Sequence, residues 1–408
     1  MAMVKVNKVL RCRIKPEPAQ RIIFWKTFGC CRKTWNLLLD ERIKSNRELG
    51  GVKFKNTTPA HLKKSYKYLN EVDSLALANT QLELNQACKR QFAKGKNPNF
   101  KRKGRDKRSY TTNATNNNIR LIHKSDTLNL LRLPKAGDVK IILHRNIPGG
   151  ELKHVTIKET ASGKFYASLV YEVQKEEVKL KEHFAADKVE AFDYSMPSLI
   201  VSSSGSFDVT EKDIKWYRKL EKKLSCAQRK LSRMKYGSHN YWKQRHKVGA
   251  IHEKAANRRK DFLHKLSHNV ADKFDAAAVE DINLQAMAKA LNFGKSVYDN
   301  GFGMLRNFLA YKLQAKGKIL VKIHPLYPSS QLCSHCKTKN PEVKNLAVRE
   351  WDCPVCGHHH HRDKNACENL KDHAIELLDR WTSGDSSLIL TPQGVLNEKE
   401  APTSWVGE

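Results

Sequence analysis

The chain has 408 residues, which suggests two or three domains, and 40% of them are hydrophobic, enough for true cores. Its 75 Lys and Arg against 42 Asp and Glu give a formal net charge of +33, a balance typical of a nucleic-acid binder. This excess is too large for an ordinary solvated surface. Membrane-surface binding is the weaker alternative, and no apolar run approaches the ~20 residues of a spanning helix.

The N-terminal part predicts one strand and then helices. Residues 4–14 end in an alternation that indicates a strand, and Pro16 and Pro18 end it. A helix should follow, because apolar residues recur there at spacings of four and three. This predicted apolar face consists of Phe24, Phe28, Cys31, Trp35 and Leu38. A second helix is predicted over residues 74–93.

Residues 89–108 form a basic segment with ten Lys and Arg, one Asp, and Phe92 and Phe100 among them. Its Gly and Pro residues predict a loop. One interpretation is a disordered basic linker. The other is a segment that contacts backbone phosphates and becomes ordered on nucleic acid, with Lys101, Arg102 and Lys103 as candidate contacts.

From Tyr110 onwards the hydrophobic period changes to two, which is typical of strands. The clearest alternation runs from Phe165 to Val173, after a turn at Ser162 and Gly163. We expect a β domain, a barrel, that the strand at residues 4–14 joins. The helical stretch 15–117 would then be an insertion into this domain.

The central part predicts short strands that carry acidic residues at their ends. Residues 189–195 form a strand with Asp193 near its end, and a turn and short strands follow over residues 198–205. Residues 276–281 predict a buried strand that ends at Glu280. A further strand is expected at residues 319–325. Three antiparallel strands with Asp193 on the first would suit an RNase H-type core.

Residues 211–265 predict a long helical stretch with eighteen Lys and Arg against five acidic residues. A charged helix is often only a solvated face. This density of positive charge favours a channel lined for phosphates, with Arg258 and Arg259 as candidate contacts.

Two Cys-x-x-Cys pairs, Cys333/Cys336 and Cys353/Cys356, have the spacing of a four-thiolate zinc site. Four thiolates leave no open position on the ion, so the site should be structural. The alternative is a disulfide or free-thiol cluster. The N-terminal residues do not indicate a signal peptide, and thiols stay reduced in the cytosol. A histidine from the run 358–361 could replace Cys356 as a ligand.

A third acidic residue, Asp363, opens a predicted helix just after the second pair of cysteines. Asp193, Glu280 and Asp363 are each a weak signal, since a single Asp after a strand is more often a turn or cap residue. Together, three carboxylates could hold two Mg²⁺ ions about 3.5–4 Å apart, as phosphodiester hydrolysis requires.

The order of these motifs closely resembles the TnpB family over nearly the whole chain. The motifs are Asp193, VEDINL at Glu280, YPSSQLCSHC (327–336), CPVC (353–356) and HRDKNACENL (361–370). The opening stretch LRCRIKPEPAQRIIFWKTFGCCRKTWN and the central TTNATNNNIRL (111–121) are also similar to that family. Its members are transposon-encoded, RNA-guided DNA endonucleases related to type V CRISPR effectors and Fanzor proteins.

The resemblance implies an α+β multidomain fold: a β-barrel wedge domain with a helical recognition insertion, and an RNase H-like RuvC nuclease domain with an inserted four-Cys zinc module. The expected segments are wedge 1–14, helical recognition 15–117, wedge 118–184, RuvC 185–325, zinc-binding target-nucleic-acid module 326–357, last RuvC segment 358–380, and a disordered tail 381–408.

The resemblance also implies the activity. A guide RNA derived from the transposon end would pair with double-stranded target DNA beside a short transposon-adjacent motif, and the RuvC site would cut with Mg²⁺. Thr115 and Asn116 are candidates for reading the flank. We expect one chain per RNA, no membrane partner, and a cytoplasmic, nucleoid-associated location in a bacterium. The alternatives are an RNA-guided repressor that binds DNA without cutting, and a transposase accessory protein.

Two positions depart from the family pattern. Many members have Asp-x-Gly where this chain has Ser195, and Asp-Arg-Asp where it has His361-Arg362-Asp363. Ser195 is expected to narrow the space beside the metal ions. Arg362 either approaches a phosphate or forms a salt bridge at the start of the helix. Asn365 is expected to orient Asp363 or to cap the helix.

Overall fold

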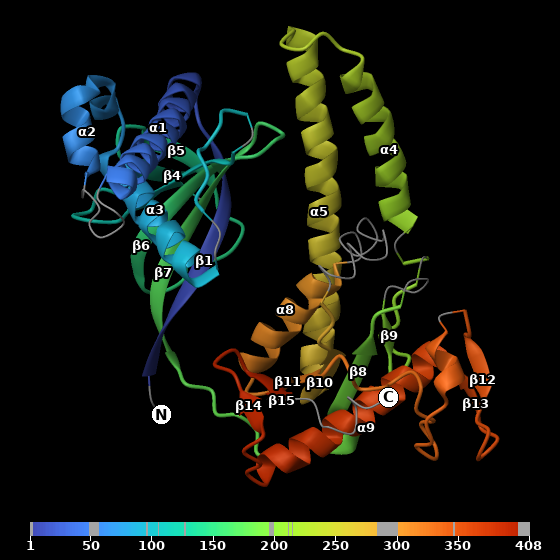
Figure 1. Cartoon of the computed structure of the whole chain (residues 1–408). Helices are drawn as coiled ribbons and strands as arrows, with labels where there is room; N and C mark the ends of the chain where they lie inside the picture. The colour runs from blue at the N-terminus through green and yellow to red at the C-terminus, as the bar shows by residue number, and fades with distance from the viewer. Residues whose placement is uncertain are drawn as a thin grey trace. The chain divides into compact units, whose positions relative to one another are not determined.

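The computed structural model describes residues 3–48, 57–94, 97–104, 106–125, 128–195, 200–210, 212–213, 215–283, 301–345 and 347–398. The fold is α+β and divides into two compact units (Figure 1). Unit 1 comprises Met1–Glu177 and Arg233–Ala250, and unit 2 comprises Val178–Ser232 and Ile251–Glu408. None of the helices in the described ranges has both the length and the apolar composition to cross a membrane.

Unit 1 is built on a curled, seven-stranded antiparallel sheet of order β2-β6-β7-β1-β5-β4-β3. Its strands are β1 (Met3–Lys15), β2 (Arg108–Asn113), β3 (Arg120–Ser125), β4 (Leu128–Leu133), β5 (Gly137–Ile142), β6 (Glu151–Glu159) and β7 (Phe165–Glu176). Its helical elements are α1 (Pro18–Glu48), α2 (Pro59–Ser65), η1 (Lys67–Glu71) and α3 (Ser74–Lys94).

The strand β1 links the two halves of this sheet. It pairs with β7 over nearly its whole length and with β5 through its last residues, Arg13 to Lys15. Leu10, Cys12 and Ile14 alternate into the core, as their spacing predicts. The predicted apolar face of α1 is confirmed, since all five of its residues are buried in the same core.

The structure corrects the boundary and the closure expected for this domain. The helical segment was expected to extend to residue 117, but β2 already starts at Arg108 and pairs with β6. Tyr110 and Thr112 alternate into the core there, so the period of two begins directly after the basic segment and within the expected helical segment. The described strands form a curled sheet with edges at β2 and β3, and not a closed barrel.

Unit 2 contains a six-stranded mixed sheet of order β14-β15-β11-β10-β8-β9. These strands are β8 (Val189–Asp193), β9 (Val201–Ser202), β10 (Ala276–Glu280), β11 (Ile319–Ile323), β14 (Leu388–Leu390) and β15 (Val395–Glu398). The four central strands are parallel, and β9 and β14 are antiparallel edges. A short ribbon of β12 (Glu350–Asp352) and β13 (His359–His361) stands apart.

Helices cover both faces of the sheet in unit 2. On one face α9 (Arg362–Thr382) packs Leu370, Ala374 and Leu377 against the alanines of β8 and β10. On the other face α5 (His239–Lys273) and α8 (Phe302–Gln314) pack against Phe192 and Val279 (Figure 1). Short 3-10 turns, η2 (Ala186–Lys188) and η3 (Pro341–Lys344), precede β8 and β12.

The expectation of a disordered tail from residue 381 is wrong for its first part. Helix α9 continues to Thr382, and β14 and β15 add two strands to the sheet beside β11. Leu388, Val395 and Leu396 are buried in the core. These short apolar runs lie among Ser, Thr, Gly, Pro and acidic residues, and that composition led to the prediction of disorder. Residues 399–408 lie outside the described ranges.

The long helical stretch expected over residues 211–265 is two antiparallel helices, α4 (Lys215–Ser232) and α5 (Figure 1). The turn between them includes Gly237, whose φ of +83° favours glycine. The Cζ atom of Arg258 on α5 lies 5.7 Å from the ring centroid of Trp216 on α4. The Cζ atom of Arg259 lies 5.0 Å from the ring centroid of Tyr217.

Candidate functional site

Two of the three predicted carboxylates end adjacent parallel strands. Strands β8 and β10 pair in register up to Phe192 and Val279, so Asp193 and Glu280 are the next residues of each. Side chains alternate along a strand, and Val189, Ala191, Ala276 and Ala278 face α9. Asp193 and Glu280 continue these two rows and therefore lie on the face of the sheet that α9 covers.

The third carboxylate, Asp363, lies in the first turn of α9, where the helix dipole favours a negative charge. The residue is 8% exposed and both of its side-chain oxygens have partners. Ser195 Oγ donates to Oδ2 at 2.6 Å. Arg349 Nη1 donates to Oδ1 at 3.4 Å. Ser195 thus contacts the carboxylate directly. Arg349, which no sequence motif singled out, also belongs to this site.

Burial and mutual repulsion both act on these acids. The pKa of Asp193 is raised well above its ordinary value, first by burial and then by the negative charges of Glu280 and Asp363. Burial raises the pKa of Glu280 from 4.5 to about 7. The three groups therefore interact electrostatically, although they come from segments far apart in the sequence.

The carboxylate oxygens of Asp193, Glu280 and Asp363 lie farther apart than the sulfur atoms of the cysteine cluster. Among the described residues, the four cysteines are the group whose possible ligand atoms all lie within 4.8 Å of one another, so the three carboxylates exceed that spacing. Ser195 and Arg349 hold Asp363 in this arrangement. An all-oxygen donor set, with Asp363 buried and Asp193 and Glu280 half-buried, nevertheless suits a hard divalent cation such as Mg²⁺.

The four cysteines come together as their spacing predicts. Cys333 Sγ lies 3.6 Å from Cys356 Sγ, and Cys336 Sγ lies 3.5 Å from Cys353 Sγ. Hydrogen bonds from Thr338 lower the pKa of Cys336 to about 6, which favours the thiolate. Four converging sulfurs fit a tetrahedral zinc ion.

A histidine of the run 358–361 does approach the cluster. The buried His360 places Nε2 3.0 Å from Cys333 Sγ and packs its ring against Trp351. From the sequence, any histidine of this run was a candidate to replace Cys356. In the structure His360 lies beside the sulfurs, and Cys356 remains in the cluster. A ring nitrogen in this place can support a thiolate from the outer shell.

The cysteine cluster and Asp363 are joined through α9. Asn365 accepts from Ser334 N at 2.9 Å and donates to Leu332 O at 2.7 Å. Asn369, one turn later, also donates to Leu332 O, at 2.7 Å. Asn365 was expected to orient Asp363 or to cap the helix. It instead fastens the loop around Cys333 to the helix that carries Asp363.

The predicted nucleic-acid contacts lie mostly on exposed positions of several elements. In unit 1, Arg102 and Lys103 are exposed, and Lys101 Nζ lies 3.8 Å from the ring centroid of Trp35. Thr115 and Asn116 occupy an exposed turn after β2, where Asn116 has a φ of +49°.

In unit 2, Arg258 is exposed and Arg259 is half-buried beside aromatic rings of α4. Arg362 differs from the other candidates, because it is 8% exposed and donates to Asn345 O at 2.8 Å. No described carboxylate forms a salt bridge within 4.0 Å with Arg362, so the expected ion pair at the helix start is replaced by a bond to backbone.

Three family models match the chain. The model described as "Cas12f1-like, TNB domain" covers residues 302–370, and the one described as "Probable transposase" covers residues 168–291. A model described as "Helix-turn-helix domain" covers residues 1–49, where the structure has the strand β1 and the single long helix α1.

Two curated relatives match over nearly the full length, and a third matches over a shorter part. A Streptomyces pristinaespiralis protein named "Putative RNA-guided DNA endonuclease" is 30% identical over 377 residues, covering 90% of this chain and 89% of the relative. An Escherichia coli K12 protein, "Putative RNA-guided DNA endonuclease InsQ", is 26% identical, with 90% and 92% covered. A mimivirus "TnpB-like protein L79" is 26% identical over 126 residues, which are 29% of this chain and 23% of the relative.

The fold is similar to that of a solved structure titled "Cryo-EM structure of the Cas12f1-sgRNA-target DNA complex". The match has a TM-score of 0.57 at 12% identity and covers 90% of this chain and 99% of that one.

Proposed function

Because this chain belongs to the TnpB family of transposon-encoded RNA-guided DNA endonucleases, we propose that it cuts DNA at Asp193, Glu280 and Asp363. The observation that carries this assignment is the shared face of the sheet. Two acidic residues end paired strands on that face, and the third opens the helix that covers it.

The chemistry assigned to this site is phosphodiester hydrolysis. Divalent ions supply the positive charge that polarises an attacking water and neutralises the scissile phosphate. Asp193, Glu280 and Asp363 would hold these ions, and the repulsion among the three acids is the reason that a cation is favoured between them. Ser195 donates to Asp363 and so fixes the direction of that carboxylate.

The cysteine cluster is assigned a structural zinc ion. Support comes from the convergence of the four sulfurs and from the absence of an open ligand position in a four-thiolate site. Asn365 and Asn369 bind the loop of this cluster to α9, so the zinc would stabilise the helix that carries Asp363. The ion would act on cleavage only through that support.

The partners assigned to this chain are a guide RNA and double-stranded target DNA. In this proposal the curled sheet of unit 1 is the wedge domain, the helices α1 to α3 are the recognition insertion, and the sheet of unit 2 is the RuvC domain. Sequence choice is left to base pairing, and the net charge of +33 offsets phosphates of both nucleic acids.

The direct test is cleavage of a guided DNA target by the purified protein–RNA complex with Mg²⁺. The unchanged complex should cut, whereas Asp193→Ala, Glu280→Ala and Asp363→Ala should each lower the rate by at least about 100-fold while RNA binding is retained. A complex that binds its target without Mg²⁺-dependent cuts would be a repressor and would exclude the endonuclease assignment.

A further inference from the structure

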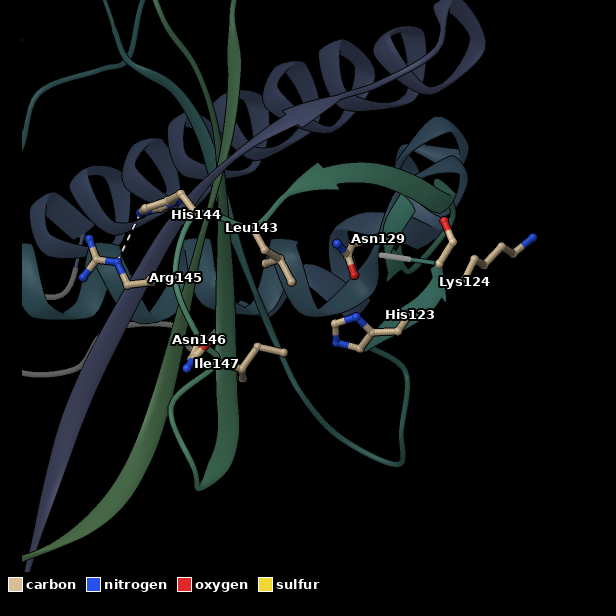
Figure 2. Close-up of a pocket in the computed structure, with 9 residues that line it drawn as sticks. His123, Lys124, Asn129, Leu143, His144, Arg145, Asn146 and Ile147 are labelled. Atoms are coloured by element: carbon tan, nitrogen blue, oxygen red, sulfur yellow. Dashed lines mark hydrogen bonds between the residues drawn. The ribbon is translucent and has the colours of Figure 1, made fainter. Parts of the chain in front are cut away.

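A cavity of about 820 Å³ lies at one end of the curled sheet of unit 1 (Figure 2). Its lining residues come from β3, from β4 and from the segment after β5, and no carboxylate is among them. The lining comprises His123, Lys124, Ser125, Asn129, Leu143, His144, Arg145, Asn146 and Ile147. The cavity shares no residue with the carboxylate site or with the cysteine cluster.

Strand alternation explains why polar side chains face this cavity. Leu131 and Leu133 of β4 are buried in the core, and Asn129 continues their row at the start of the strand. His123 is the direct cross-strand partner of Asn129, and Leu121 is that of Leu131. The inner face of the sheet therefore changes from leucine to Asn129 and His123 where the cavity opens.

The amide of Asn129 is not satisfied in this setting. Its Oδ1 is inaccessible and accepts no hydrogen bond from any described residue. An unpaired buried acceptor is costly unless a partner compensates for it. Rotation of the side-chain amide exchanges the positions of Oδ1 and Nδ2, so this group can present either a donor or an acceptor to a ligand.

The opposite wall is apolar and leads to a positive charge. Figure 2 shows Leu143 and Ile147 across the space from Asn129 and His123. Arg145 Nε donates to His144 Nε2 at 3.1 Å, which leaves further N–H donors on the exposed guanidinium at the edge of the cavity. The cavity thus combines an apolar wall, an amide and a cation at its edge.

We propose that this cavity binds one unpaired nucleotide of the guide RNA, with the base between Leu143, Ile147 and His123. The edge of the base would pair with the amide of Asn129, and the phosphate would bind Arg145. An RNA nucleotide is favoured over a DNA nucleotide because structured RNA offers splayed, unstacked bases, whereas duplex DNA keeps its bases paired. The choice of RNA rests on the proposed function, but the chemistry of the cavity does not.

The test uses the full chain, first freed of co-purified RNA and then carrying it. Isothermal titration with AMP, CMP, GMP, UMP and inorganic phosphate measures the dissociation constants. At least one nucleotide should bind the RNA-free protein. Asn129→Leu should raise the dissociation constant of that nucleotide by about tenfold and leave that of phosphate unchanged. Arg145→Gln should raise both dissociation constants by about tenfold.

The matched control is Lys140→Gln, an exposed position of β5 on the outer face of the same sheet. It should change each dissociation constant by less than about twofold, since the proposed contacts lie on the inner face. Thermal melts should show that Asn129→Leu is folded, because leucine already occupies the next inward positions of β4.

Two results would overturn the inference. If phosphate binds as tightly as every nucleotide and Asn129→Leu changes nothing, the cavity is a general anion site. If the RNA-loaded protein still binds a mononucleotide there, the occupant is not a guide-RNA nucleotide. In either case guided cleavage by the same preparation shows that the proposed function stands. A chain that carries no RNA would instead fail the proposed function.

Discussion

At the scale of single residues, Asp193 and Glu280 show what the fold does to an acid. Both end strands whose preceding residues are fully buried, so burial disfavours their charged forms. The pKa of Glu280 rises to about 7, and that of Asp193 rises well above its ordinary value, with the charges of Glu280 and Asp363 added to burial. These residues therefore weaken the metal-free fold at neutral pH.

Glu280 should make the metal-free protein less stable as the pH rises. Its pKa in the folded chain, about 7, lies above the ordinary value of 4.5. Below pH ~4.5 the carboxyl is protonated in both states and costs nothing, and above pH ~7 the full cost of about 3 kcal/mol is present. Urea unfolding in EDTA at pH 5 and pH 8 measures the loss.

Glu280→Gln should reduce that loss by a comparable amount, because the amide does not ionise. The exposed Glu182→Gln is the control and should leave the difference between the two pH values unchanged. An equal loss of stability in the wild type and in Glu280→Gln would contradict the assigned burial of Glu280.

The sequence could predict part of this site. Asp193 follows Ala191 and Glu280 follows Ala278 at a spacing of two, so their common face follows from strand alternation once the strands are known to pair. The bond from Ser195 to Asp363 joins positions 168 residues apart. No local pattern encodes such a contact, and the same holds for Arg349.

At the scale of elements, α9 connects the cysteine cluster to the sheet. Its first turn carries Asp363, its next turns bind the loop at Cys333 through Asn365 and Asn369, and its remaining length packs on β8 and β10. The spacing of the cysteines predicted the cluster. The two asparagines could not be assigned to it from the sequence, because their partners are backbone groups of a distant loop.

Asn365→Ala should loosen the cysteine cluster. The change removes two hydrogen bonds to the loop at Cys333. Ser334 N loses its acceptor, at a cost of about 1–3 kcal/mol, whereas Leu332 O keeps the bond from Asn369. Zinc release to a chromogenic chelator should become about tenfold faster or more. The exposed Lys364→Ala, on the same helix, should release zinc at the wild-type rate. Equal release from Asn365→Ala and Lys364→Ala would show that the asparagine does not support the cluster.

The C-terminal strands β14 and β15 lead to a second prediction. A chain ended after Ser387 loses both strands, exposes the edge of β11 and forfeits the burial of Leu388, Val395 and Leu396. At about 1.5–3 kcal/mol for each buried side chain, the loss is on the order of 5 kcal/mol. Thermal unfolding measures the loss.

A chain ended after Glu398 keeps both strands and serves as the control. It should melt within a few degrees of the full-length chain. If the truncation after Ser387 melts at the same temperature as this control, the two strands contribute nothing to stability.

At the scale of the whole molecule, positive charge is the dominant property. With +33 formal charges, the affinity for RNA should fall steeply with salt, by about 10³-fold or more between 50 and 200 mM if six to ten phosphates are neutralised. The double change Arg258→Gln and Arg259→Gln should lower the slope of log affinity against log salt by about one to two. An unchanged slope would remove α5 from the nucleic-acid contacts.

The sequence predicted the domain organisation of the chain better than the boundaries of its segments. The insertion of helices into a β domain and the second sheet with its cysteine module follow from changes in hydrophobic period. The predicted boundaries were wrong where a strand carries polar residues, as Arg108–Asn113 does, or where a strand is very short, as Leu388–Leu390 is. Such strands form because neighbouring strands supply their hydrogen bonds and neighbouring side chains bury them. A local sequence pattern does not contain this information.

The wide spacing of the three acids along the chain bears on biosynthesis. Asp193 and Glu280 emerge from the ribosome well before α9, and β15, which pairs beside β11, emerges after α9. A nascent chain therefore lacks its third carboxylate until α9 has been synthesised. In the proposed assignment, an unfinished polypeptide cannot cut the chromosome of the cell that is making it.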